Sequence, residues 1–120
     1  MPKALIIEDD QVTRVLMRKM LEHIDYEVDE AQNGIEGLAN IEKSKYDVIL
    51  LDIHMPEMDG IQMMTVVKER KLTLPVIVVS AYAVNEGKNK LLELGVNLFL
   101  HKPFDIKDFY EMIERVKLQD

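Results

Sequence analysis

Four short apolar runs in this sequence each lead, at the C-terminal end, into residues whose side chains can do chemistry. In chain order these are residues 4–7 before Glu8 and Asp9, residues 48–51 before Asp52, residues 76–79 before Ser80, and residues 96–100, with His101 between, before Lys102. Together the side chains supply carboxylates, a hydroxyl and an ammonium group. That combination suits a divalent cation and a phosphoryl group.

The apolar runs must position these side chains. Short runs rich in β-branched residues are typical of strands that are buried on both faces of a sheet. If the runs lie parallel in one sheet, their C-terminal ends share one edge, and ligands of open α/β sheets bind in the crevice at that edge. The reactive residues are therefore expected to line one pocket.

The acidic residues predict a metal site. Glu8, Asp9 and Asp52 would bring three carboxylates together, and like charges at such close range destabilise one another. A hard cation removes the repulsion, and Mg²⁺ commonly binds one or two carboxylates plus a phosphate oxygen. We therefore expect Mg²⁺ at this edge, with Mn²⁺ as the alternative ion.

Asp52 is the candidate phosphoacceptor. It follows a wholly apolar run and precedes the loop 53–60, and a carboxylate can act as a nucleophile that forms an aspartyl phosphate. Phosphoryl transfer then needs in-line positioning and neutralisation of the equatorial oxygens. Lys102 can supply a cation for this purpose, and the Ser80 hydroxyl can donate to another oxygen.

Amphipathic segments separate the runs and predict helices. The expected helices are one over residues 12–24 entered at Asp10 or Gln11, one opened by Asn33-Gly34, one started by Asp59-Gly60, one over residues 85–94 ended by Gly95, and one capped by Asp105. The buried stripe of the last helix is expected to be Ile106, Phe109, Tyr110, Ile113 and Val116. Residues 26–31 alternate weakly and predict an edge strand. This βα order, repeated five times, predicts a parallel sheet with helices on both faces and right-handed crossovers.

Length and composition narrow the class of protein. A chain of 120 residues with 48% apolar residues is expected to form one domain, 1–120, with its own core. The net charge of −7 argues against direct binding of nucleic acid. There is no cysteine and no apolar run long enough to span a bilayer. The start also lacks the apolar segment of a signal peptide, so a soluble, cytoplasmic protein without a membrane partner is expected.

The reactive positions resemble a known signature. Glu8-Asp9, Asp52, Ser80-Ala81 and Lys102-Pro103 resemble the conserved set of response-regulator receiver domains, the phosphoacceptors of two-component signalling. The resemblance covers essentially the whole chain. It implies a flavodoxin-like (βα)5 three-layer sandwich whose five-stranded parallel sheet has the order 2-1-3-4-5.

The resemblance also implies roles for the site residues. Asp52 would receive the phosphoryl group from the phosphohistidine of a sensor histidine kinase or histidine phosphotransferase. Asp9 and Asp52 would bind Mg²⁺ directly, Glu8 would act through water, and His54 would contribute its backbone carbonyl. Lys102 would pair with the phosphate and, before phosphorylation, with Asp52. The peptide bond that follows Lys102 would be cis, which proline tolerates.

A switch is implied as well. Ser80 would move toward the phosphate and Phe99 would rotate inward behind it, so that the surface of the fourth helix, fifth strand and fifth helix changes shape for a downstream target. Phe99 stands where tyrosine is common, so its outward state lacks one anchoring hydrogen bond. The bulky His54 and Tyr82 are expected to flank the phosphate and to limit the access of water.

Such a protein would be a signalling phosphoacceptor, not an enzyme beyond its own phosphorylation and dephosphorylation. It is expected to act as a stand-alone regulator or phosphorelay intermediate, or to be an excised receiver domain, and to be a monomer or a weak phosphorylation-dependent dimer.

Other functions use similar residues. A phosphatase of the haloacid-dehalogenase type also has a strand-end aspartate with Mg²⁺, but it needs a second acid where this sequence has His54. A flavin-binding electron carrier would need a phosphate-binding loop after the first strand, where this chain is acidic. A third alternative is a binding module that acts independently of phosphorylation. Its function would not require the acidic residues or Lys102.

Overall fold

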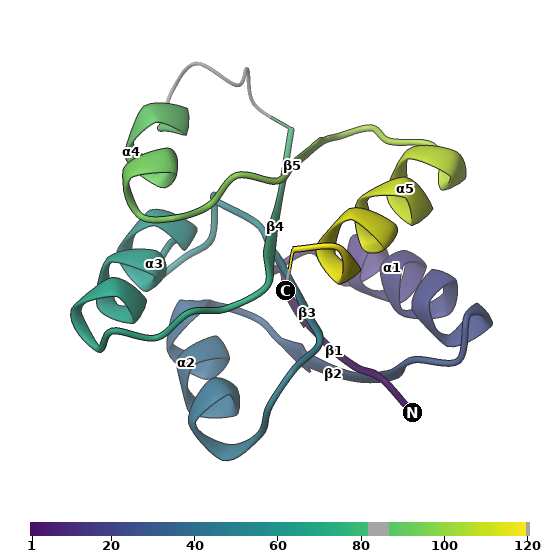
Figure 1. Ribbon diagram of the computed structural model, residues 1–120, viewed down its shortest axis with the longest axis horizontal. Helices are drawn as coiled ribbons and strands as arrows, with labels where there is room; N and C mark the ends of the chain where they lie inside the picture. The colour runs from purple at the N-terminus through teal and green to yellow at the C-terminus, as the bar shows by residue number, and fades with distance from the viewer. Residues whose placement is uncertain (82–86, 120) are drawn as a thin grey trace.

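The computed structural model describes residues 1–81 and 87–119, which form alternating strands and helices (Figure 1). In chain order the elements are β1 (Lys3–Ile7), α1 (Gln11–His23), β2 (Glu27–Ala31), α2 (Gly34–Lys43), β3 (Val48–Leu51), α3 (Gly60–Glu69), β4 (Val76–Ser80), α4 (Lys88–Glu93), β5 (Phe99–His101) and α5 (Ile106–Lys117). No helix among these residues has the length and apolar character that crossing a membrane requires.

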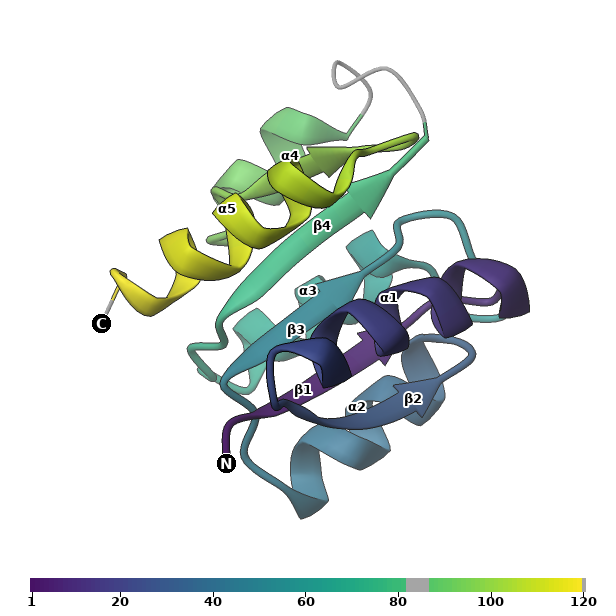
Figure 2. The ribbon, with the colours of Figure 1, turned by 90° about the vertical axis from the view of Figure 1, so that its right-hand side faces the viewer.

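The strands form one parallel sheet in the order β2-β1-β3-β4-β5. Helices α1 and α5 cover one face, and α2, α3 and α4 cover the other, so the molecule has three layers (Figures 1 and 2). This is the flavodoxin-like arrangement and the strand order that the resemblance implied.

Each central strand contributes to both sides of the core. Because side chains alternate along a strand, Ile6, Leu50 and Ile77 pack in the cluster under α1 and α5. Their neighbours Leu5, Ile49 and Val78 pack in the cluster under α2, α3 and α4. The apolar runs are therefore continuous because both faces of the sheet are covered, as predicted.

Polar caps start most of the helices. The side chains of Asp10, Asn33, Asp59 and Asp105 each accept a hydrogen bond from a backbone N–H in the first turn of the following helix. All four were expected at helix starts. Gly95, at φ 97°, has the left-handed conformation expected after the fourth helix.

The C-terminal third differs from the sequence prediction in detail. Strand β5 begins at Phe99 rather than residue 96, because the Val96 N–H donates to the Leu91 carbonyl and so completes the end of α4. Helix α4 begins at Lys88, and the expected start near Asn85 lies outside the described residues. Ile106 was expected in the buried stripe of α5, but it is 62% exposed in the first turn of that helix.

The apolar residues of α1 do not all face the core. Met17, Met20 and Leu21 are buried against the sheet, whereas Val12 and Leu16 are 76% and 50% exposed. The predicted helix is therefore correct, but its apolar spacing includes a second face that points to solvent.

Candidate functional site

Strand register brings the acidic residues together. Ile7 pairs with Leu51 across β1 and β3, so Glu8 and Asp52 leave neighbouring strands at the same level. The Asp52 N–H also donates to the Ile7 carbonyl over 3.0 Å. The C-terminal edge of the sheet therefore places these carboxylates side by side, as the sequence predicted.

The carboxylate cluster has the composition of a site for a hard cation. One oxygen each from Glu8, Asp9 and Asp52 lies within 4.8 Å of the others. Glu8 is completely buried and Asp52 nearly so, while Asp9 is exposed and opens the cluster to solvent. An all-oxygen donor set with an open side fits Mg²⁺, which keeps several of its waters when protein-bound.

The electrostatics of the cluster are unfavourable without a cation. Burial raises the pKa of the Glu8 carboxyl, and Asp52 raises it further, while Lys102 opposes the shift. The pKa of Asp9 is also raised, first by partial desolvation and then by Glu8. Both shifts mean that the folded protein disfavours ionised carboxylates at these positions.

Lys102 follows β5 and so lies at the same C-terminal edge of the sheet. Ser80 pairs with His101 across β4 and β5, and the Lys102 N–H donates to the Ser80 carbonyl over 2.8 Å. The peptide bond between Lys102 and Pro103 is cis, as the resemblance implied.

The Lys102 ammonium pairs mainly with Glu8. Its Nζ donates to Glu8 Oε1 and lies 3.9 Å from Asp52 Oδ1. The resemblance implied that Lys102 pairs with Asp52 before phosphorylation. That ion pair is present, and Glu8 is a second partner that the resemblance did not imply. The longer side chain of Glu8 reaches the ammonium first.

The switch residues lie on the neighbouring strands β4 and β5, where Phe99 pairs with Val78, two residues before Ser80. Ser80 ends β4 and is buried, and Phe99 begins β5 and is half-buried. The Lys88 Nζ of α4 lies 5.4 Å from the centroid of the Phe99 ring, a cation–π distance. His54 is exposed beside the cluster, while Tyr82 lies outside the described residues.

The loop after Asp52 is held by a close backbone approach. The Gly60 N–H donates to the Ile53 carbonyl over 2.9 Å. A Cβ at Gly60 would lie 2.7 Å from the Asp52 carbonyl oxygen, so only glycine fits. Helix α3 can thus begin directly against the backbone of the candidate phosphoacceptor.

One contributor was not found from the sequence. The guanidinium of Arg14 on α1 donates from Nη1 to the carbonyl oxygens of Glu8 and Asp9 over 2.8 and 3.0 Å. The only sequence signal was its position, one turn into a helix that starts at the acidic loop. Arginines are so common on helices that this position alone does not indicate a contact with the loop.

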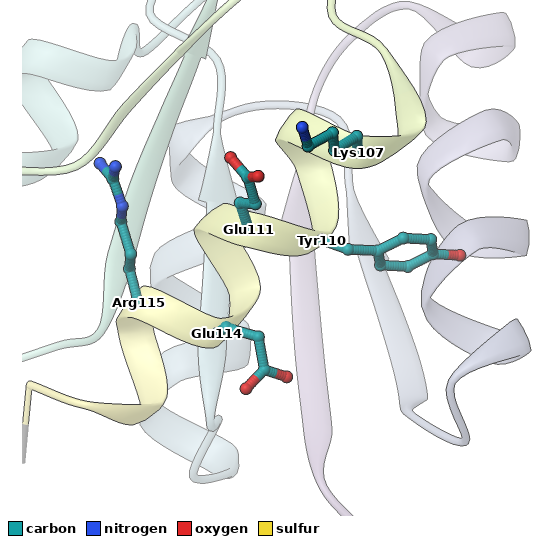
Figure 3. A pocket seen from close by; sticks show the side chains of 5 residues that line it. All are labelled: Lys107, Tyr110, Glu111, Glu114 and Arg115. Carbon is teal, nitrogen blue, oxygen red and sulfur yellow. The ribbon is translucent and has the colours of Figure 1, made fainter.

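A separate hollow lies on the outer face of α5. It is lined by Lys107, Tyr110, Glu111, Glu114 and Arg115 (Figure 3). Tyr110 points toward α1, and its hydroxyl donates to the Met20 carbonyl over 2.9 Å. The hollow shares no residue with the carboxylate cluster, and Tyr110 has a structural role there.

Comparison with known proteins places the chain in a family. The family model of the response regulator receiver domain matches residues 4–114. Transcriptional regulatory protein ResD of Bacillus subtilis is 36% identical over 115 residues, which are 96% of this chain and 46% of that protein. Across the first curated relatives, this chain spans half of their length or less.

Solved structures agree with this placement. A CheY-like receiver domain protein from Methanospirillum hungatei is 31% identical, with a TM-score of 0.89 and coverage of 99% of this chain and 96% of that one. The receiver domain of sensor histidine kinase PA1611 from Pseudomonas aeruginosa, solved with magnesium coordinated in its active site cleft, is 27% identical. Its TM-score is 0.83, and 95% of each chain is covered.

The chain therefore belongs to the response regulator receiver domain family. Its fold, and the gathering of the predicted acids and Lys102 at one sheet edge, agree with that membership. The individual roles of these residues remain predictions.

The raised pKa of Asp9 gives a test of the carboxylate repulsion. A carboxyl whose pKa in the folded state lies above the ordinary 3.8 destabilises the fold as the pH rises, because the folded protein holds its proton more tightly. We expect Asp9→Asn to raise the free energy of unfolding of the metal-free protein at pH 7 by roughly 0.5 kcal/mol, a modest value because Asp9 is exposed. The gain should decrease as the pH falls through the raised folded-state pKa and vanish well below the ordinary value of 3.8, where the carboxyl is protonated in both states.

Urea denaturation in the presence of a chelator measures this difference. Glu111→Gln, which removes an exposed carboxylate from the middle of α5, away from the helix ends, is the matched control and should show no comparable gain. Equal stability of Asp9→Asn and wild type at both pH values would contradict the repulsion.

Proposed function

We propose that this receiver domain takes a phosphoryl group onto Asp52 from a phosphohistidine, with Mg²⁺ held by Asp9, Asp52 and the backbone carbonyl of His54, and by Glu8 through water. The observation that carries the proposal is the carboxylate cluster. Its oxygens lie within 4.8 Å of one another, and the Lys102 ammonium stands 3.9 Å from Asp52.

The proposed reaction is a single in-line displacement. An Asp52 carboxylate oxygen attacks phosphorus, the N–P bond of the phosphohistidine breaks, and the electron pair returns to the imidazole nitrogen. A bound Mg²⁺ supplies neutralisation of the phosphoryl oxygens on the side of the acidic cluster. Burial of Asp52 in a tightly paired sheet end keeps the nucleophile in one position.

Lys102 and Ser80 complete the charge neutralisation in this proposal. Lys102 leaves Glu8 and pairs with a phosphoryl oxygen, which it can reach because Asp52 already lies within ion-pair distance. Ser80 donates its hydroxyl proton to another oxygen. The two residues are linked through the Lys102 N–H and the Ser80 carbonyl.

The same site argues for a phosphoacceptor rather than a turnover enzyme. The phosphatase alternative needs a second carboxylate two residues after the nucleophile, and this chain has the exposed His54 there. Family membership gives that alternative no support. In the proposal the domain catalyses only its own phosphorylation and dephosphorylation.

Phosphorylation would be read through a switch at Ser80 and Phe99. Phe99 lacks the hydroxyl that could anchor it on the surface, but the Lys88 ammonium lies over its ring. We infer that this contact stabilises the unphosphorylated state, since the ring must leave it to rotate inward. The surface of α4, β5 and α5 would then change for a downstream target.

The exposed face of α1 is suited to the phosphodonor protein. Val12, Val15 and Leu16 follow directly after the acidic loop and lie at i, i+3 and i+4, so they share one side of the helix. All three are exposed. An apolar patch beside a phosphoacceptor fits a histidine kinase or histidine phosphotransferase whose own apolar surface surrounds the donor histidine.

Other expectations stay predictions. They are a cytoplasmic location, no binding of nucleic acid or membrane, use of Mn²⁺ in place of Mg²⁺, and a monomer or weak phosphorylation-dependent dimer.

Small-molecule phosphorylation tests the central proposal. Incubation with Mg²⁺ and acetyl phosphate should add one phosphoryl group to the wild-type chain, as measured by intact mass. Asp52→Asn should gain none, and a chelator should prevent the gain in wild type. Turnover of phosphate esters well above background would instead favour the phosphatase.

The contact between Lys88 and Phe99 gives a test of the switch. Lys88→Gln removes the ammonium group from the Phe99 ring and should destabilise the outward orientation of the ring, relative to the inward one, by about 0.5–1 kcal/mol. The ratio of inward to outward rings should therefore rise roughly two- to fivefold. Fluorine NMR of 4-fluorophenylalanine-labelled protein measures this shift at Phe99, with Phe99→Leu used to assign the resonance. Lys90→Gln, on the same helix, is the control and should leave the Phe99 resonance unchanged. If Lys88→Gln also leaves this resonance unchanged, the contact between Lys88 and Phe99 does not stabilise the outward ring.

The α1 patch gives a test of donor recognition. Leu16→Ser should slow transfer from the phosphohistidine protein about tenfold, the effect of losing roughly one buried aliphatic side chain at the contact. Transfer from acetyl phosphate should be unchanged. Ile35→Ser on α2 removes a side chain of similar exposure, 53% against 50%, and should leave both rates alone. Equal slowing by both substitutions would exclude a specific role for α1.

A further inference from the structure

Arg14 holds the backbone on both sides of Asp9. Its Nη1 donates to the carbonyl oxygen of Glu8 over 2.8 Å and to that of Asp9 over 3.0 Å. These two carbonyls belong to the peptide planes that flank the Asp9 Cα. Because each peptide group is planar, fixing both planes also fixes the direction in which the Asp9 side chain leaves the backbone.

Arg14 is itself held in place from the sheet. Its Nε donates to Glu30 Oε1 over 3.1 Å, and only 11% of its side chain is exposed. The other Glu30 oxygen accepts from Arg18 Nε over 2.5 Å, and Arg18 Nη2 donates to the Val28 carbonyl over 3.0 Å. Glu30 on β2 therefore connects two arginines of α1, and only Arg14 of this pair is described in contact with the acidic loop.

We propose that Arg14 is a positioning residue for the metal site, which orients Asp9 through the backbone and so sets the affinity for Mg²⁺. The inference rests on the proposed function. Ligand orientation matters for Mg²⁺ because this ion demands near-ideal octahedral geometry. Residues that orient metal ligands contribute to affinity without touching the metal.

Charge alone predicts the opposite effect. Arg14 is a cation near a cation site. On electrostatic grounds alone, replacing it with a neutral residue should therefore strengthen the binding of Mg²⁺. Glu30 pairs with Arg14 and offsets part of that charge, since it also pairs with Arg18. If positioning dominates, the loss of Arg14 weakens binding, so the sign of the change separates the two effects.

Arg18 supplies a matched control. Arg14 and Arg18 both pair with Glu30, and both are partly buried between α1 and β2. A purely structural role in joining α1 to β2 would make the two substitutions equivalent. A positioning role makes only Arg14 important for the metal.

The test is calorimetric titration of the full chain with Mg²⁺ at pH 7, below the unfolding temperature of each variant. Arg14→Met should weaken the affinity about tenfold, at the low end of the range for residues that orient metal ligands. Arg18→Met should stay within about twofold of wild type, since it leaves both loop carbonyls bound to Arg14. Arg14→Lys should recover part of the loss, because one ammonium group can still donate to a loop carbonyl.

If Arg14→Met binds Mg²⁺ as tightly as wild type or more tightly, the inference is overturned, while binding by wild type leaves the proposed function intact. If Arg14→Met and Arg18→Met weaken binding equally, the inference is overturned in favour of a structural role for both arginines. Failure of wild type to bind Mg²⁺ would overturn the proposed function and this inference with it. If Arg14→Met does not fold, Arg14→Lys and Arg18→Lys carry the comparison. Weaker binding by Arg14→Lys alone would support positioning, and equal affinities of the two variants would overturn it.

Discussion

Repulsion between carboxylates at the edge of the sheet is the constraint on which this structure depends. Three acidic side chains bring oxygens within 4.8 Å of one another, and one of them, Glu8, is fully buried. A buried charge is strongly destabilising unless it is paired and hydrogen-bonded. The chain meets this need with two donors to the Glu8 carboxylate, the Lys102 ammonium at Oε1 and the Asp10 N–H at Oε2. The raised pKa of Glu8 indicates that the compensation is incomplete.

Such a cluster can persist only on a rigid support. Strands β1, β3 and β4 are covered by helices on both faces, and their close-packed aliphatic side chains leave the strand ends little freedom to separate. Backbone hydrogen bonds carry the register to the last residues, since Asp52 donates to Ile7 and Lys102 to Ser80. Gly60 then lets α3 begin against the Asp52 carbonyl. The apolar interior thus supports the unfavourable charges at its rim.

The sequence predicted the parts of the site that depend on strand ends. Continuous apolar runs specify strands buried on both faces, and parallel pairing then fixes which residues meet, so Glu8, Asp9, Asp52 and Lys102 were found together. Spacing was less informative on helices, because a 3.6-residue period cannot distinguish a core face from an exposed apolar face. Ile106 and Val12 show this limit. The sequence did not predict that Lys102 pairs with Glu8, nor the contacts of Arg14. Both depend on how far side chains reach in three dimensions, and no local sequence pattern records this.

The position of Lys102 would allow the proposed unphosphorylated and phosphorylated states to share one site with little movement. Its backbone N–H is bound to the Ser80 carbonyl, so the main chain stays in place while the flexible side chain selects its partner. Glu8 holds the ammonium, and Asp52 Oδ1 is already within 3.9 Å of it. A new negative charge on Asp52 would therefore need only rotation about side-chain bonds to capture it. The same backbone bond joins Lys102 to Ser80, and β5 joins Lys102 to Phe99. The residue proposed to sense the charge is therefore physically continuous with the residues proposed to report it.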